Sequence, residues 1–131
     1  MDACALMAVI VKEPERDFII QLTQDAELVC PNMIPYEISN ALTKMMKKNV
    51  IDKQRMLNAF KYFQNIPFKT IKIDFEKALE IAWEYKIYAY DACYLETAKR
   101  LNIPLLTFDN SMIKVGKKLG INVIGEKNVG I

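Results

Sequence analysis

Four acidic residues stand at the junctions between the elements that this sequence predicts. Asp109 follows the short apolar run at 104–108, and Asp91 stands where a helical pattern begins. Asp2 opens the first helical run, and Glu37 lies in the first turn of a later helix. Carboxylate oxygens are the ligands that hard cations such as Mg²⁺ and Mn²⁺ prefer in proteins. These four acids, if gathered, would therefore form a metal site.

A gathered set of carboxylates needs a cation. Two unit charges about 4–5 Å apart at an effective dielectric near 20 repel each other by roughly 3–4 kcal/mol. A hard cation held by a few acids keeps open water positions, so it can activate water and neutralise charge on a scissile phosphate. The four acids therefore indicate phosphoryl chemistry, such as hydrolysis of a phosphodiester bond.

Each acid also has an ordinary structural interpretation. Asp91 alone is more often a helix cap, and Asp109, within "DNS", is more often a turn former. Glu37 alone is more often a favourable acid in a first helical turn, and Asp2 alone is more often just a terminal residue. The metal-site hypothesis depends on all four lying at one edge of the fold.

Several absences limit the chemistry. The chain has no histidine, which excludes a Ser-His-Asp triad, a Cys-His pair, a two-histidine ribonuclease mechanism and zinc held by histidine. Acid–base work would fall to carboxylates, lysine, tyrosine or metal-bound water. The three cysteines, Cys4, Cys30 and Cys93, lie far apart and form no CxxC pair. We therefore expect reduced thiols and a cytoplasmic location.

Charge and hydropathy add little about partners. The net charge is +2, so bulk charge favours no class of partner, and any basic binding surface must be local. No apolar stretch approaches the roughly 18 residues of a membrane span, so we expect no membrane partner.

The elements that must position the acids alternate between helix and strand. The 131 residues predict a single domain, 1–131, of the α/β class with a parallel sheet. In open parallel sheets, sites form at the carboxyl ends of the strands, so we expect all four acids at one rim. The expected helices span 2–11, 15–24, 35–48, 52–65, 75–85, 91–101 and 111–119, and the expected strands span 27–30, 69–73, 104–108 and 121–124.

The beginning of the chain departs from this pattern. A parallel α/β domain usually starts with a strand that feeds the first turn, and here only Met1 precedes Asp2. We expect that the first strand is truncated or that the natural start lies upstream. An apolar run of about four or five residues before Met1 would restore a central strand.

Four segments of the chain carry a resemblance to a known family: "DACALMAVIVKEPE", "PYEISNALTK", "YAYDACYLETAKRLNIPLLTFDNSM" and "GINVI". With these segments the chain resembles the PIN-domain family, and in particular its small VapC-type toxins. The segments touch both ends of the chain and its middle, so the resemblance extends over nearly all of it, and the third segment is the most specific. This resemblance implies a PIN-like three-layer α/β/α sandwich with a parallel sheet.

The resemblance also implies an activity. Family members carry an acidic, metal-dependent ribonuclease site, whose first-turn Asp corresponds to Asp2, helical Glu to Glu37, helix-starting Asp to Asp91 and strand-end Asp to Asp109. The expected protein is a VapBC-type toxin, an endoribonuclease that hydrolyses RNA phosphodiester bonds with Mg²⁺ or Mn²⁺. The expected partners are an RNA substrate, a cognate antitoxin protein and a second copy in a homodimer.

Other residues of the sequence could support this site. The family places a small hydroxyl residue two before the last Asp, where this chain has Thr107, and another two after the first Asp, where it has Cys4, whose thiol is a weak donor. Asn40 could reach the metal through water or be an exposed amide. The lysines Lys44, Lys47, Lys48, Lys114, Lys117 and Lys118 could line an RNA groove or form a solvated basic face.

Several other side chains have predominantly structural interpretations. Glu96 faces roughly away from Asp91, and Trp83 is predicted to lie in the core. Tyr88 and Tyr90 are expected to pack in the core or at the rim more often than to stack on bases. The apolar content of 52–68 exceeds what one helix face needs, which predicts burial against a second copy or a partner.

Two functions of other classes are alternatives to the nuclease, and the sequence disfavours one of them. The domain could be a catalytically inactive PIN-like module that binds RNA or protein, which the altered first segment suggests. A receiver-like phospho-acceptor domain is disfavoured, because Asp2 is followed by Ala3 and Cys4 and not by a second acid.

Overall fold

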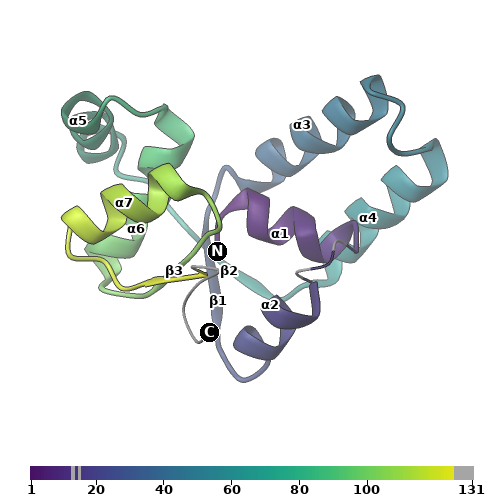
Figure 1. Ribbon diagram of the computed structural model, residues 1–131, viewed down its shortest axis with the longest axis horizontal. Coiled ribbons are helices and arrows are strands. Elements are labelled where there is room, and N and C mark those ends of the chain that lie inside the picture. The colour runs from purple at the N-terminus through teal and green to yellow at the C-terminus, as the bar shows by residue number, and fades with distance from the viewer. Residues whose placement is uncertain (13, 15, 126–131) are drawn as a thin grey trace.

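The structure is a computed structural model that describes residues 1–12, 14 and 16–125 of the chain. Within these residues, seven helices alternate with four short strands (Figure 1). The helices are α1 (Ala3–Ile10), α2 (Arg16–Thr23), α3 (Ile34–Lys47), α4 (Lys53–Asn65), α5 (Phe75–Tyr85), α6 (Ala89–Leu101) and α7 (Asn110–Lys118). The strands are β1 (Leu28–Pro31), β2 (Phe68–Ile71), β3 (Leu105–Leu106) and β4 (Val123–Ile124).

The strands pair in parallel, which confirms the α/β class. Leu28 lies opposite Phe68 in the β1–β2 pair, and Leu105 lies opposite Val123 in the β3–β4 pair. Within the described residues these are two separate two-stranded sheets, so the parallel sheet lacks a middle strand there. The physical reason is that no described strand pairs with both β1 and β3.

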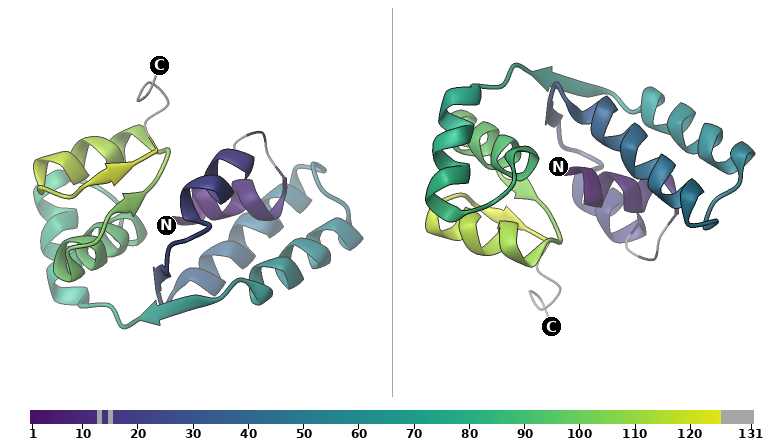
Figure 2. Two further views of the ribbon diagram at one scale, coloured as in Figure 1. Left: turned by 90° about the horizontal axis from the view of Figure 1, so that it is seen from below. Right: turned by 90° about the horizontal axis from the view of Figure 1, so that it is seen from above.

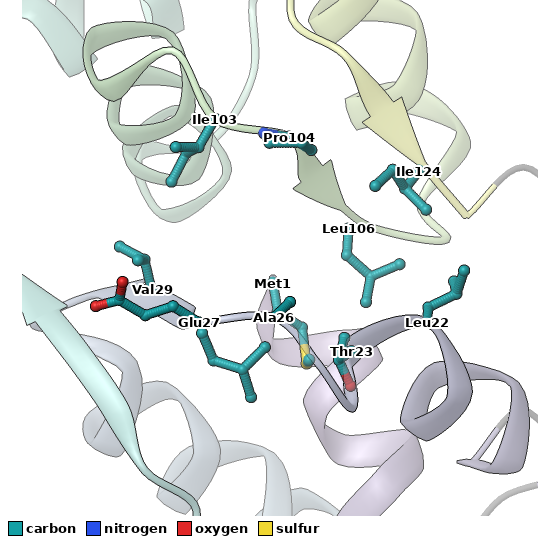
Figure 3. A pocket seen from close by; sticks show the side chains of 11 residues that line it. Met1, Leu22, Thr23, Ala26, Glu27, Val29, Ile103, Pro104, Leu106 and Ile124 are labelled. Carbon is teal, nitrogen blue, oxygen red and sulfur yellow. The ribbon is translucent and has the colours of Figure 1, made fainter.

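The amino end of the chain lies in the gap between the two sheets. The Asp2 N–H donates to the Leu106 carbonyl at 3.0 Å, and the Cys30 thiol donates to the Met1 carbonyl at 3.6 Å. A pocket of about 280 Å³ continues from Met1 along this gap, and Val29 and Leu106 line opposite sides of it (Figure 3). The pocket therefore occupies the position at which a central strand was expected.

Two buried helices form the centre of the molecule. α1 is apolar on all sides, and every residue of it except Cys4 is buried, as expected for a helix that packs on several neighbours. α6 is buried continuously from Ala92 to Ala98. In both views of Figure 2, α5, α6 and α7 lie on one side of the amino end and α1 to α4 lie on the other. The N-terminal ends of α1 and α6 carry two of the candidate acids.

One helix boundary differs from the sequence-based expectation. Helix α6 begins at Ala89 and not at Asp91, because the Ala92 N–H already donates to the Tyr88 carbonyl at 3.0 Å and closes a turn before that point. Tyr88 is the N-cap residue, and its side chain makes no capping hydrogen bond. The interpretation of Asp91 as a helix cap is therefore wrong.

The apolar segment 52–68 mainly serves the core of its own chain. Phe63 is buried, and its ring centroid lies 5.4 Å from that of Phe60 and 5.9 Å from that of Phe68. Met56 also packs against the core, whereas Tyr62 is 40% exposed. This segment therefore provides little surplus apolar surface for a second copy, and self-association remains a prediction. Among the described helices, none has both the length and the hydropathy that a membrane span requires.

Candidate active site

Asp2 is a buried carboxylate that ties the start of α1 to the end of β3. As the N-cap of α1, it accepts a hydrogen bond from the Ala5 N–H at 2.9 Å through Oδ1. Its Oδ2 accepts a short hydrogen bond from the Thr107 hydroxyl. Burial raises the pKa of Asp2 and the charge of Asp109 raises it further, while the bonds from Thr107 and Ala5 oppose the rise. The carboxylate is thus fixed in place but costly to ionise.

Asp109 is held by the same threonine. The Asp109 N–H donates to Thr107 Oγ1 at 3.1 Å, so one buried hydroxyl joins Asp2 and Asp109. Asp109 is the N-cap of α7, where its Oδ1 accepts from the Met112 N–H at 3.1 Å. Gly125 packs directly on the Thr107 carbonyl, where a Cβ atom would clash with that oxygen. Close packing around Thr107 therefore sets the positions of two acids.

Glu37 lies in the first turn of α3, as expected, and is half-buried. Its Oε1 accepts a hydrogen bond of 2.5 Å from the Tyr94 hydroxyl of α6. Burial raises the pKa of Glu37, and so do the charges of Asp91 and Asp2, whereas the Tyr94 bond and the charge of Lys44 lower it. Glu37 is thus oriented by a neighbouring helix and lies within the electrostatic reach of two other acids.

Asp91 is the least constrained of the four acids. It is partly buried in the first turn of α6, and its carboxylate makes no hydrogen bond within the described part of the chain. Burial raises the pKa of Asp91, and the negative charges of Asp109 and Asp2 raise it further. Both oxygens of this carboxylate are therefore available to an outside ligand.

The electrostatic effects indicate that the four acids lie within reach of one another's charge or of a shared neighbour. Asp109 acts on Asp2 and Asp91, and Asp2 and Asp91 both act on Glu37. All four reach Cys4: burial and then the charges of the four acids raise the pKa of its thiol to about 11. The structure thus brings together carboxylates from α1, α3, α6 and the turn before α7, while their catalytic roles remain a prediction.

Comparison with known proteins places this chain in a family. The family model of the PIN domain matches residues 1–118. The chain belongs to the PIN domain family. PIN domains are generally nucleases and typically use divalent metals. A search of curated proteins gave no match.

A solved structure shares the PIN fold. The chain is similar to PAE2754 from Pyrobaculum aerophilum, with a TM-score of 0.71 and 24% sequence identity. The similarity covers 94% of this chain and 81% of PAE2754. At this level of identity, the likeness supports the fold of this PIN domain and not a shared substrate.

The acids of this PIN domain suit a divalent cation in chemistry, but they are not yet gathered as ligands. All four supply oxygen, which Mg²⁺ and Mn²⁺ prefer, and their mutual repulsion favours a bound cation. However, no group of three or more candidate ligand side chains lies close enough to hold a metal within the described residues. Metal binding would therefore require the four carboxylates to come closer together, and no hydrogen bond to a described residue holds that of Asp91 in place.

The expected supporting residues lie at different distances from the acids. Thr107 contacts two of the acids, whereas Asn40 is exposed on α3 and its side chain makes no hydrogen bond to a described residue. Lys44 is exposed and lowers the pKa of Glu37, so its charge reaches the site. The other candidate lysines are also exposed. Lys47 and Lys48 lie at the C-terminal end of α3, and Lys114, Lys117 and Lys118 lie on α7.

Several sequence-based interpretations need correction. Trp83 was expected in the core but is 77% exposed, because it lies on the outer face of α5. Tyr88 is 87% exposed, so packing does not explain it. Glu96 does face away, as expected, and is paired with Arg100 at 2.5 Å. Sequence reasoning missed Tyr94, although its position three residues after Asp91 places it near that acid on α6.

Proposed function

We propose that this PIN domain is a metal-dependent endoribonuclease that acts as the toxin of a VapBC-type toxin–antitoxin pair. The observation that supports it most strongly is that acids from distant parts of the sequence lie within electrostatic reach of one another. The charge of Asp109 raises the pKa of Asp2 and Asp91, and the charges of Asp91 and Asp2 raise the pKa of Glu37. None of these four acids makes an ion pair within the described residues, so no cation of the chain neutralises them directly. Such a cluster is suited to a Mg²⁺ or Mn²⁺ cofactor.

In this proposal, the four acids bind the cation, and two neighbouring side chains hold the acids in position. Asp2, Glu37, Asp91 and Asp109 would hold the cation, which when bound supplies charge neutralisation at the scissile phosphate and a more acidic water. Thr107 fixes the spacing of Asp2 and Asp109, and it holds them before RNA binds. Tyr94 orients Glu37 and favours its ionised form.

RNA would bind beside the acids through lysines. Lys44 lies two turns after Glu37, and Lys47 and Lys48 extend the same surface, with Lys114 on α7. Lysine contacts to phosphates weaken as salt rises. The proposed setting is the cytoplasm, with an antitoxin protein that blocks the site and a homodimer as the assembly.

A second candidate function has its own support. The described acids do not approach closely enough to count as a metal-ligand group, and Cys4 stands where a hydroxyl residue would support the first Asp. These features favour a catalytically inactive PIN-like module that binds RNA or protein. Such a module would bind RNA without cutting it.

The deciding experiment is cleavage of a labelled single-stranded RNA with and without Mn²⁺. The wild-type chain should cut only with the metal, and Asp91→Asn should abolish cutting while leaving the fold intact. Asp25→Asn, in an exposed turn, is the matched control and should cut normally. Wild-type cleavage by Asp91→Asn would end its catalytic assignment, and RNA binding without any cleavage by the parent would favour the inactive module.

A further inference from the structure

An exposed apolar row runs along the outer face of α5. Phe75, Leu79 and Trp83 are 63%, 59% and 77% exposed. Residues four apart lie on the same face of a helix. The opposite face of α5 packs against α6, where Ala78 is buried. Helix α5 lies at the edge of the molecule (Figure 1), and its apolar row, Phe75, Leu79 and Trp83, is not needed for the core of the chain.

An acidic row runs beside the apolar one. Glu76, Glu80 and Glu84 each follow a member of the α5 apolar row by one residue, which places them about 100° further round the helix. All three are exposed, and none makes an ion pair among the residues that the structure describes. An open depression of about 800 Å³ lies over the acidic row and over two members of the apolar row; it is lined by Glu76, Leu79, Glu80, Trp83, Glu84 and Lys86.

A lysine of the chain already contacts the aromatic ring at the end of the α5 apolar row. The Lys86 ammonium lies 3.8 Å from the centroid of the Trp83 ring. An aromatic face attracts cations through its quadrupole, and more strongly when water is excluded. A partner lysine or arginine that took the place of Lys86 at Trp83 would make the same kind of contact that the chain makes within itself.

The charge pattern disfavours a second copy as the occupant. In an antiparallel self-pair of α5 helices, like flanks meet, so the three glutamates of one copy would face those of the other. Like charges at close range are destabilising. A basic partner would instead neutralise the row, and its apolar side chains would cover Phe75, Leu79 and Trp83.

We propose that the outer face of α5 docks a basic amphipathic helix of a partner protein. The rise from Phe75 to Trp83 is about 12 Å at 1.5 Å per residue, so about two to three turns of partner helix span it. Apolar side chains at a spacing of three and four would fill the depression, and a neighbouring row of lysine or arginine would lie along Glu76, Glu80 and Glu84. The proposal does not depend on the acid site, since none of these residues belongs to it.

Trp83 provides a direct probe, because it is the single tryptophan of the chain. The full chain is titrated with a leucine–lysine amphipathic peptide of roughly 18 residues, a length that can form a helix. We expect a saturable blue shift of Trp83 emission that weakens as salt rises. Two comparison peptides are a scrambled leucine–lysine sequence and a leucine–glutamate helix, and neither should produce the shift.

Two variants and their controls assign the binding to this face. The double variant Glu80→Lys with Glu84→Lys should weaken binding of the leucine–lysine peptide about tenfold, as expected when two exposed attractions become repulsions. Asp25→Lys, also exposed, should leave it unchanged. Leu79→Ser should weaken binding as well, whereas Leu57→Ser, 43% exposed on α4, should not. If Leu79→Ser fails to fold, the double variant Glu80→Lys with Glu84→Lys alone tests whether the peptide binds to this face of α5.

Three outcomes would overturn the proposal. An equal shift with the scrambled or leucine–glutamate peptide would show that the contact is not with a basic amphipathic helix. A blue shift that grows with protein concentration alone would identify a second copy as the occupant. A shift with zwitterionic lipid vesicles but not with the peptide would identify a membrane surface.

Discussion

The Tyr94 hydroxyl donates a hydrogen bond of 2.5 Å to Glu37 Oε1, which joins α6 to α3 across the candidate site. Tyr94 is 2% exposed, so the donor cannot easily be replaced by water. The bond opposes the effect of burial and lowers the pKa of Glu37. It also raises the pKa of Tyr94, together with burial and the Glu37 charge, so the phenol stays protonated and remains a donor.

Tyr94→Phe should therefore change the pH dependence of RNA cleavage. Removal of the hydroxyl takes away a contact that favours ionised Glu37, so the pKa of Glu37 rises further. The acidic limb of the cleavage profile should move to higher pH, and the maximum rate should fall. The unfolding free energy should drop by about 1–3 kcal/mol, the usual cost of removing one partner of a buried hydrogen bond.

The matched control for this change is Tyr36→Phe. Tyr36 is 74% exposed and lies in the same helix as Glu37. Removal of its hydroxyl should change neither the pH profile of cleavage nor the free energy of unfolding. An unchanged acidic limb in Tyr94→Phe would show that Glu37 does not limit cleavage through its ionisation.

Thr107→Val should damage the site although it nearly conserves volume. The valine can neither donate to Asp2 nor accept from the Asp109 N–H, so both acids lose a fixed contact. We expect a loss of about 1–3 kcal/mol in unfolding free energy, together with loss of Mn²⁺-dependent cleavage. Denaturant unfolding and cleavage are measured on the same samples.

A second buried threonine, Thr97, provides a control for Thr107→Val. The Thr97 hydroxyl is buried and has no hydrogen-bond partner among the described residues. Thr97→Val should therefore be neutral or stabilising, because it removes an unsatisfied buried polar group. Equal losses of stability in the two variants would mean that the bonds of Thr107 are not what holds the acids.

The stability of the metal-free chain should fall as pH rises through the titration of the acids. The pKa values of Asp2, Glu37 and Asp91 are raised in the folded state, from ordinary values of 3.8 for the aspartates and 4.5 for the glutamate. Between the ordinary and the raised values, the folded state binds more protons than the unfolded state. Stability is therefore greatest below about pH 4 for these groups and is lost as pH rises through the raised values.

The melting temperature as a function of pH tests this. Asp91→Asn removes one charge from the cluster, so the decline with pH should be shallower than in the wild type. Mn²⁺ should restore stability above neutral pH, since a ligand that binds only the folded state stabilises it. Asp25→Asn should reproduce the wild-type slope. Parallel pH curves for Asp91→Asn and the wild type would contradict mutual repulsion at the site.

Local patterns in the sequence predicted most of the fold. The apolar spacing around Ile38 and Leu42 predicts α3, and both side chains are buried there. The same kind of reasoning failed at Trp83, because an apolar stripe does not say which side of a helix meets the core. Local patterns also could not show the contact between Glu37 and Tyr94, since these residues are 57 positions apart in the sequence and meet only when α3 and α6 pack together.

The edges of β1 and β3 face the pocket that extends from Met1. In a strand, backbone donors point alternately to the two sides. The N–H groups of Leu105 and Thr107 donate to Asn122 and Ile124 on the β4 side, so that of Leu106 points toward the pocket. On the other side, the Asn32 N–H donates to Ile71 of β2. By the same alternation, Pro31 and Val29 turn their backbone groups away from β2 and toward the pocket. Since proline has no N–H, Val29 is the residue of β1 that offers a backbone donor there.

Joining five valine and isoleucine residues to the amino end of Met1 should therefore stabilise the fold. The added segment would continue from the Asp2–Leu106 hydrogen bond, pair with both edges and bury apolar side chains in the pocket. A gain of about 1 kcal/mol raises the melting temperature by roughly 3–6 °C in a domain of this size. A glycine–serine extension of equal length is the control and should have no such effect. Leu106→Pro removes the donor that faces the pocket, so it should cancel most of the gain. Equal melting temperatures for the apolar and glycine–serine extensions would show that the gap between β1 and β3 does not accept a strand.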